Sequence, residues 1–175
     1  MSNTGNKPAI IAGSGLLSMP GLTIDETVKV DTPWGQPSGP VHKGRLNGVE
    51  VLFMTRHGDA HTIPPHKVNY RANIAALKEE GASHLLAYNA VGGICADCDA
   101  GRLVVADQVI DYTWGREHTY YAGGEGGVEH VDFTSPYDET SRQVLISAAD
   151  NAGVTILKQG TYGATQGPRL ESAAE

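Results

Sequence analysis

Short apolar runs that lead into glycine-containing turns dominate the first half of the chain. Residues 9–12 and 49–54 are nearly continuous in apolar side chains, and a turn follows each run. Such runs predict buried β-strands. The same pattern predicts three further strands, at residues 84–91, 103–110 and 154–163.

Two other segments repeat their apolar residues at helical spacing. The pattern predicts one helix over residues 68–80 that stops at Gly81, and another over 136–152 that stops at Gly153. A third helix is predicted to begin at Gln166–Pro168, because proline suits the first helical position and good helix formers follow it.

Strands that alternate with helices predict an α/β fold with a mostly parallel or mixed central sheet. Ligands of such sheets bind beyond the carboxyl ends of the strands. In this sequence, polar and flexible residues gather at those ends: Gly13–Gly15, Arg56–Gly58, Asn89–Gly93 and Thr165–Pro168. The sequence therefore predicts a binding site along one edge of the sheet.

Composition and charge narrow the class of protein. The 175 residues fit one domain, and 20 acidic against 13 basic residues give a net charge of −7, which argues against nucleic acid as the main partner. No apolar run approaches the ~20 residues that span a bilayer. Residues 1–8, expected to be a disordered tail, lack the features of a secretory signal. Together with only 2 cysteines, this favours a reducing, cytoplasmic location and no membrane partner.

Two of the strand ends suit an anion. Gly13-Ser14-Gly15 offers backbone N–H groups and a hydroxyl, although it lacks the third glycine of the dinucleotide fingerprint and equally fits a plain turn. Arg56 offers a planar fork of donors that fits phosphate, and His57 adds a second donor. The alternative for this pair is a surface charge with a capping histidine.

Other clusters give weaker signals. Three histidines suggest a metal site: His57, His61 and His66. Pro64 and Pro65 oppose the helix that would align them, and no glutamate completes a zincin motif. Cys95 and Cys98 have zinc or redox spacing, but neither further ligands nor a thioredoxin pattern accompanies them, which favours two free thiols in a loop.

Residues 114–121 are rich in aromatic side chains and precede the glycine-rich stretch 123–127. That combination suits a loop that covers a ligand or packs on a neighbouring subunit, and equally an ordinary surface loop. His130 follows soon after and carries the same two interpretations.

Taken together, these motifs resemble the trimeric nucleoside phosphorylases, in particular their methylthioadenosine phosphorylase branch. The resemblance runs from about Ala9 to Glu175. Several long motifs occur in the family's order and spacing: Asp31–Gly35, Arg56–Gly58 with His61, Pro65–Asn73, Asn89–Gly93 and Gly167–Glu171.

The resemblance implies a nucleoside phosphorylase-like α/β fold with a mixed central sheet flanked by helices, a homotrimer, and neither metal nor cofactor. It also implies reversible phosphorolysis of a purine nucleoside, with inorganic phosphate as co-substrate and with positioning and electrostatics in place of a covalent nucleophile. The residues implied for phosphate are Ser14, Arg56, His57, Asn89 and the backbone N–H of Ala90. Those implied for the purine are Gly92, Leu170 and Glu171, with His130 lent to the 5′ pocket of a neighbouring subunit.

Two positions separate this sequence from the methylthioadenosine phosphorylases. Asn89 stands where that branch has Thr, and Leu170-Glu171 stands where it has Phe-Ser. Glu171 matches the glutamate with which 6-oxopurine phosphorylases accept the N1–H of the base, whereas adenine N1 is itself an acceptor. We therefore expect a methylthioinosine phosphorylase, with a methylthioadenosine or general purine nucleoside phosphorylase as alternatives.

Residues 9–175 are expected to be the N-terminal portion of a phosphorylase domain, because further site residues of the family would lie beyond Glu175. A natural polypeptide of roughly 250 to 300 residues would fit, and residues 1–175 alone are expected to give no useful turnover. Two other classes stay open. A metal-dependent hydrolase would use the three histidines, and a non-catalytic module would bind purine or phosphate without turnover.

Overall fold

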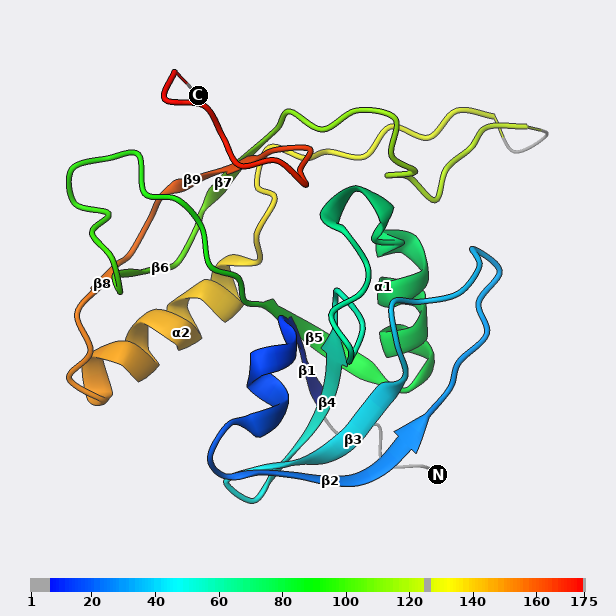
Figure 1. Ribbon diagram of the computed structural model, residues 1–175, viewed down its shortest axis with the longest axis horizontal. Coiled ribbons are helices and arrows are strands. Elements are labelled where there is room, and N and C mark those ends of the chain that lie inside the picture. Colours follow the sequence, from blue (N-terminus) through cyan, green and yellow to red (C-terminus); the bar gives the residue numbers. More distant parts are fainter. Residues whose placement is uncertain (1–6, 125–126, 175) are drawn as a thin grey trace. The chain divides into compact units, whose positions relative to one another are not determined.

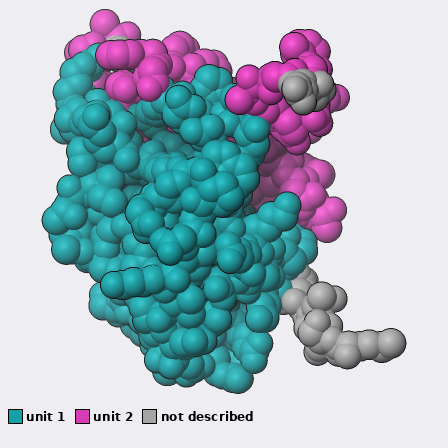
Figure 2. Space-filling view, turned by 90° about the vertical axis from the view of Figure 1, so that its right-hand side faces the viewer, with its two compact units in different colours: residues 1–90, 116–120, 167–170 teal, residues 91–115, 121–166, 171–175 magenta. Residues whose placement is uncertain are grey.

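The computed structural model describes residues 7–124 and 127–174. The chain divides into two compact units, which Figure 2 colours separately. Unit 1 comprises residues 1–90, 116–120 and 167–170, and unit 2 comprises residues 91–115, 121–166 and 171–175. Among the described residues, each unit contains its own β-strands and one α-helix.

Unit 1 is built on a five-stranded sheet with the order β2-β3-β4-β1-β5 (Figure 1). The strands are β1 (Lys7–Ala12), β2 (Leu22–Val28), β3 (Val41–Leu46), β4 (Val49–Thr55) and β5 (Ala82–Ala87). β1 runs parallel to both β4 and β5, whereas β2, β3 and β4 are antiparallel neighbours. The sheet is therefore mixed, as the sequence predicts, and it sets three parallel strands side by side.

The apolar core of unit 1 lies between the sheet and the helix α1 (Tyr70–Glu79). Apolar side chains of β1, β3 and β4, together with Val30 of the loop after β2, meet the buried face of the helix in one cluster: Ala9, Ile11, Val30, Val41, Leu52, Met54, Ala76 and Leu77. Two short 3-10 helices complete this unit, η1 (Ser14–Ser18) after β1 and η2 (Pro65–Lys67) before α1. The core thus fixes the strands whose ends carry the predicted site.

Two asparagines of the Pro65–Asn73 motif hold the loop before β3 against α1. Asn69 caps the helix, since its Oδ1 accepts a backbone hydrogen bond from the first turn at 3.1 Å, and its Nδ2 donates to the carbonyl of Trp34 at 2.8 Å. Asn73 is fully buried; its Oδ1 accepts from Ser38 N at 2.7 Å and its Nδ2 donates to Ser38 Oγ at 3.0 Å. These motif residues therefore build the scaffold of unit 1.

Residues 116–120 pack against the same end of α1. The hydroxyl of Tyr120 donates to the carbonyl of Arg71 at 2.8 Å, and its ring meets that of Trp34 edge-on with centroids 4.8 Å apart. The Arg71 guanidinium pairs with Glu117 at 3.0 Å. Part of the aromatic stretch predicted to cover a ligand or a neighbouring subunit thus packs on α1 of its own chain.

Unit 2 contains two short parallel strand pairs and the helix α2 (Glu139–Asn151). β6 (Leu103–Val104) pairs with β8 (Ile156–Leu157), and β7 (Gln108–Asp111) pairs with β9 (Thr161–Ala164). Arg142 of α2 donates to the carbonyls of Ala106 at 2.9 Å and Lys158 at 2.6 Å, which ties the helix to the segments that follow β6 and β8. Within the described residues, no helix is long and apolar enough to cross a membrane.

Most predicted elements are confirmed with shifted ends. β1, β4, β5, α1 and α2 lie where the apolar pattern places them. The single strands predicted at 103–110 and 154–163 are each divided into two short strands. β1 begins at Lys7, inside the segment 1–8 expected to be a tail, and residues 1–6 lie outside the described residues.

Two predictions about elements fail for identifiable reasons. The strands β2 and β3 were not predicted. β2 exposes its five central residues and so shows no alternation of buried and exposed positions, and β3 (Val41–Leu46) has apolar side chains only at its two ends. The helix predicted from Gln166 is wrong, since residues 165–174 form only bends and turns. A helix needs a packed face as well as good formers, and residues 168–174 are all exposed.

Candidate active site

The three parallel strands of unit 1 end at the same edge of the sheet. Ala12 at the end of β1 is in register with Thr55 at the end of β4, and β5 pairs with the other side of β1. The parallel pairing continues one residue further, because Arg56 N donates to Ala12 O at 2.9 Å and Tyr88 N donates to Ile11 O at 3.0 Å. The turns that follow these strands therefore begin side by side.

Arg56 joins two of these turns through its side chain. Its Nη1 donates to the carbonyl of Tyr88 at 2.9 Å, and its Nε donates to Nε2 of His57 at 3.0 Å. Arg56 as a residue is half-buried. It bridges the turn after β4 to the segment that leads into Asn89 and Ala90, and it sets a fixed positive charge at this edge of the sheet.

The two hydrogen bonds of His57 define its tautomer. Nδ1 lies 2.8 Å from the carbonyl oxygen of Ile63, which can only accept, so Nδ1 carries the proton. Nε2 then accepts from Arg56. In this arrangement His57 is neutral and orients the guanidinium, and Arg56 supplies the charge.

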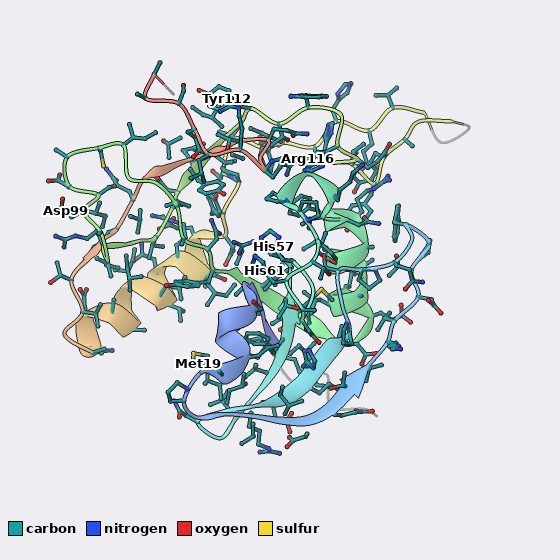
Figure 3. All side chains as sticks on the ribbon, viewed as in Figure 1. Met19, His57, His61, Asp99, Tyr112 and Arg116 are labelled. Carbon is teal, nitrogen blue, oxygen red and sulfur yellow. The ribbon has the colours of Figure 1, made fainter. Side chains whose placement is uncertain are left out.

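Ser14, the first residue of η1 after β1, reaches the same turn. Its Oγ lies 3.4 Å from Nδ1 of His61, whose backbone has a left-handed φ of 54°. The rings of His57 and His61 are 5.0 Å apart between centroids, and Figure 3 labels them close together beyond the ends of the strands. The structure therefore brings Ser14, Arg56 and His57 to one place.

A hydrogen-bond network around the buried side chains of His42 and Thr55, which the sequence did not reveal, supports this turn. Asp59 accepts a hydrogen bond from Thr55 Oγ1 at 2.7 Å and another from Nε2 of His42 on β3 at 3.2 Å. His42 Nδ1 lies 3.0 Å from Thr27 Oγ1 of β2. His42 is buried and lies 17 residues from Asp59, and no short motif connects the two.

The histidines do not form a metal cluster in the part of the chain that the structure describes. No group of three or more His, Cys, Asp or Glu side chains that could hold a metal ion occurs there. The two ring nitrogens of His57 are both engaged, by the carbonyl of Ile63 and by Arg56. The donors at this edge, a guanidinium and a hydroxyl, suit an anion.

The residues predicted to bind the base or to serve the 5′ pocket are divided between the two units. In unit 2, Glu171 Oε1 accepts a hydrogen bond from Thr165 Oγ1 at 2.6 Å. Gly92 and His130 are exposed members of the same unit. Leu170, in unit 1, is 85% exposed. The roles of these four residues stay predictions, as do those of Asn89 and Ala90.

Known proteins match this chain over almost all of its length. The family model described as "Phosphorylase superfamily" matches residues 7–175. A probable S-methyl-5'-thioinosine phosphorylase of Xanthomonas campestris pv. campestris is 50% identical over 175 residues, which are 100% of this chain and 70% of that protein. A 6-oxopurine nucleoside phosphorylase of Pyrococcus furiosus is 46% identical over 95% of this chain and 64% of its own length.

A solved structure shows the same fold. The methylthioadenosine phosphorylase of Schistosoma mansoni in its apo form superposes with a TM-score of 0.87 at 34% identity. The match covers 97% of this chain and 66% of that one. The chain thus spans about two thirds of the length of the proteins that it matches.

Proposed function

Because the chain belongs to the phosphorylase superfamily, we propose that the protein cleaves 5′-methylthio-purine nucleosides by phosphorolysis, with methylthioinosine as its preferred substrate. The products are the free 6-oxopurine base and 5-methylthioribose 1-phosphate, which makes the enzyme a pentosyltransferase. The observation that carries the proposal is the meeting of Ser14, Arg56 and His57 at the carboxyl ends of β1 and β4.

The chemistry needs position and charge rather than a covalent nucleophile. A phosphate oxygen attacks the anomeric carbon as the bond to the purine breaks, so positive charge develops on the sugar and negative charge on the departing base. Arg56 and Ser14 hold the phosphate, and His57 fixes the direction of the guanidinium. Asn89 and the backbone N–H of Ala90 complete the phosphate site. Preorganised donors of this kind lower the barrier without reorganising during the reaction.

Glu171 sets the choice of base. A 6-oxopurine presents N1–H as a donor, and a carboxylate is an acceptor, whereas adenine presents an acceptor at N1. The hydroxyl of Thr165 donates to one carboxylate oxygen of Glu171 at 2.6 Å, which orients the group as an acceptor. Gly92 and Leu170 are proposed as further residues that bind the base.

The proposal extends to the setting in which the enzyme works. We place it in purine salvage in the cytoplasm, as a homotrimer in which His130 of one subunit serves the 5′ pocket of the next. Phosphate is a co-substrate, and no metal or cofactor takes part. The net charge of −7 supports small-molecule substrates rather than nucleic acid.

The first experiment uses the longer natural polypeptide of which residues 1–175 are expected to be a part. It compares the initial rates of base release from methylthioinosine, methylthioadenosine and inosine, each with and without orthophosphate. We expect hypoxanthine release from methylthioinosine that depends on phosphate and survives a chelator. Release of the base at the same rate with and without phosphate, but not in the presence of a chelator, would identify a metal-dependent hydrolase instead. Binding of purine or phosphate without release would identify a non-catalytic module.

Replacing Glu171 tests the base assignment. Hydrogen bonds to charged groups contribute about 1.5–3 kcal/mol, so Glu171→Gln should lower kcat/KM for methylthioinosine roughly tenfold or more. The loss for methylthioadenosine should be smaller. The matched control is Glu79→Gln on the exposed side of α1, which should leave both values unchanged. Equal losses for both nucleosides, or a preference of wild type for the adenine nucleoside, would overturn the assignment.

A further inference from the structure

Cys95 and Cys98 lie against each other in a tight turn of unit 2. The backbone N of Cys98 donates to the carbonyl of Cys95 at 3.0 Å, which closes the turn. The two Sγ atoms are 2.7 Å apart and share a hydrogen bond. A closed turn keeps its end Cα atoms within about 7 Å, and a disulfide needs a Cα separation of roughly 4.4–6.8 Å. The turn therefore keeps the two residues close enough for a bridge to form without a large movement of the backbone.

The position of Cys98 is set by Gly93. A Cβ added to Gly93 would lie only 2.1 Å from the carbonyl oxygen of Cys98 and 2.8 Å from its Cβ. Only a glycine permits this approach, because any larger residue would place its Cβ against Cys98. The backbone of Gly93 therefore packs directly on Cys98. The side chain of Cys98 is held in place while it faces Cys95.

The two thiols differ in access. Cys95 is exposed, whereas Cys98 is partly covered. The hydrogen bond to Cys95, and secondly burial, raise the pKa of the Cys98 thiol. Cys95 is thus the thiol that an oxidant in solution meets first, and Cys98 is the neighbour placed to react afterwards.

A structural zinc ion does not explain the pair. Such ions take four protein ligands. Among the described residues, no cluster of three or more His, Cys, Asp or Glu side chains could supply them. The chemistry left to two adjacent thiols is oxidation to a disulfide.

We propose that Cys95 and Cys98 form a redox-active dithiol that reacts with small-molecule disulfides and closes an internal disulfide bond. The Cys95 thiolate attacks one sulfur of the small disulfide, forming a mixed disulfide and expelling one small thiolate. Cys98 loses its proton to solvent and attacks the Cys95 sulfur, expelling the second small thiolate. The protein dithiol gives up two electrons, and the small disulfide is reduced to two thiols. This site is independent of the proposed phosphorolysis.

The experiment exposes the reduced protein to glutathione disulfide, blocks the remaining thiols with iodoacetamide and measures the intact mass. We expect the wild type to lose two hydrogens, to take up no alkyl group and to keep no glutathione. Cys98→Ser should stop with one glutathione on Cys95. Peptide mapping of the wild type should find residues 95 and 98 joined, which does not depend on any variant folding.

Two results would overturn the proposal. One is a wild type that keeps a stable glutathione adduct on Cys95 without closing the bridge. The other is a wild type whose thiols both remain open to alkylation under conditions that fully load Cys98→Ser. The Cys95→Ser/Cys98→Ser variant, compared with the wild type by circular dichroism, controls for folding.

Discussion

His42 and Asp59 are the side chains through which β3 supports the turn that carries Arg56 and His57. The carboxylate of Asp59 accepts from both Thr55 and His42, so it fixes the turn on two sides. The ring of His42 is buried, and its loss would leave part of this network unpaired. We therefore expect the pair to act on the proposed phosphate site through position and not through contact with a reacting atom.

Asp59→Asn and His42→Leu should each lower the free energy of unfolding by about 0.5–1.5 kcal/mol, because each weakens or removes hydrogen bonds of this network while water reaches the 41% exposed side chain of Asp59. The double variant should lose less than the sum of the two, since the residues are in contact. Kinetics should show a larger rise in the KM for phosphate than in the KM for nucleoside. Asp25→Asn, on the exposed face of β2, is the control. Equal changes in both KM values would show a general structural role only.

At the scale of elements, Asn69 connects the start of α1 to the loop around Trp34. Its Oδ1 caps the helix and its Nδ2 donates to the loop carbonyl. Asn69→Asp keeps the acceptor and loses the donor, whereas Asn69→Ala loses both. Alanine should therefore cost about 1–2 kcal/mol of stability and aspartate less, as measured by urea unfolding. An aspartate variant as unstable as the alanine variant would contradict this division of roles.

Lys43 ties β3 to the C-terminal cap of α1. Its Nζ lies 2.7 Å from Glu80 and 3.3 Å from Glu26, and the hydrogen bond to Glu80 is the main cause that raises the pKa of Lys43 above 10.5. A lysine with a raised pKa binds its proton more tightly in the folded state. The stability that it contributes is therefore complete below its ordinary pKa and is lost as the pH rises through the folded value.

Lys43→Met keeps the aliphatic stem and removes the charge. We expect it to cost about 0.5–1 kcal/mol at neutral pH, because the lysine is one-third exposed and water screens the pair. Denaturant unfolding at several pH values should show the difference from wild type shrinking above pH 10.5. A difference that grows in that range would refute the ion-pair explanation.

The elements also show what an apolar pattern can and cannot predict. β1 and β4 were predictable because their runs are almost entirely apolar, as strands flanked on both sides require. β2 was not, because its five central residues are all exposed and an irregularity between Ile24 and Glu26 interrupts its register with β3. α1 begins two residues later than predicted, because the side chain of Asn69 caps it there.

At the scale of the whole molecule, the position of the candidate site was predictable and its support was not. Strand ends rich in glycine and polar residues indicated Ser14, Arg56 and His57, since parallel strands present those ends together. The network of His42 and Asp59 depends on a pairing between distant strands that no local spacing encodes. The asparagines of the Pro65–Asn73 motif were visible in the sequence, but their contacts required the fold.

Orthophosphate should stabilise the whole folded protein. A ligand that binds only the folded state adds about 2.7 kcal/mol at a hundred times its Kd. We expect phosphate to raise Tm in a thermal melt relative to chloride at equal ionic strength. Arg56→Gln should abolish this shift, whereas Arg45→Gln, which removes an exposed arginine on β3, should retain it. Equal shifts in both variants would indicate a general salt effect.

β5 has a hydrogen-bonded neighbour on one side only among the described strands, and it exposes Leu85 and Leu86 by 40% and 38%. Consecutive strand residues point to opposite faces, so each face of the sheet carries an exposed apolar side chain at this edge strand. An exposed apolar edge strand can pair with the edge strand of another chain, and repeated pairing of this kind leads to aggregation. Concentrated samples of these 175 residues should therefore aggregate over time, which light scattering would detect. The scattering should be lower for the variant Leu85→Lys.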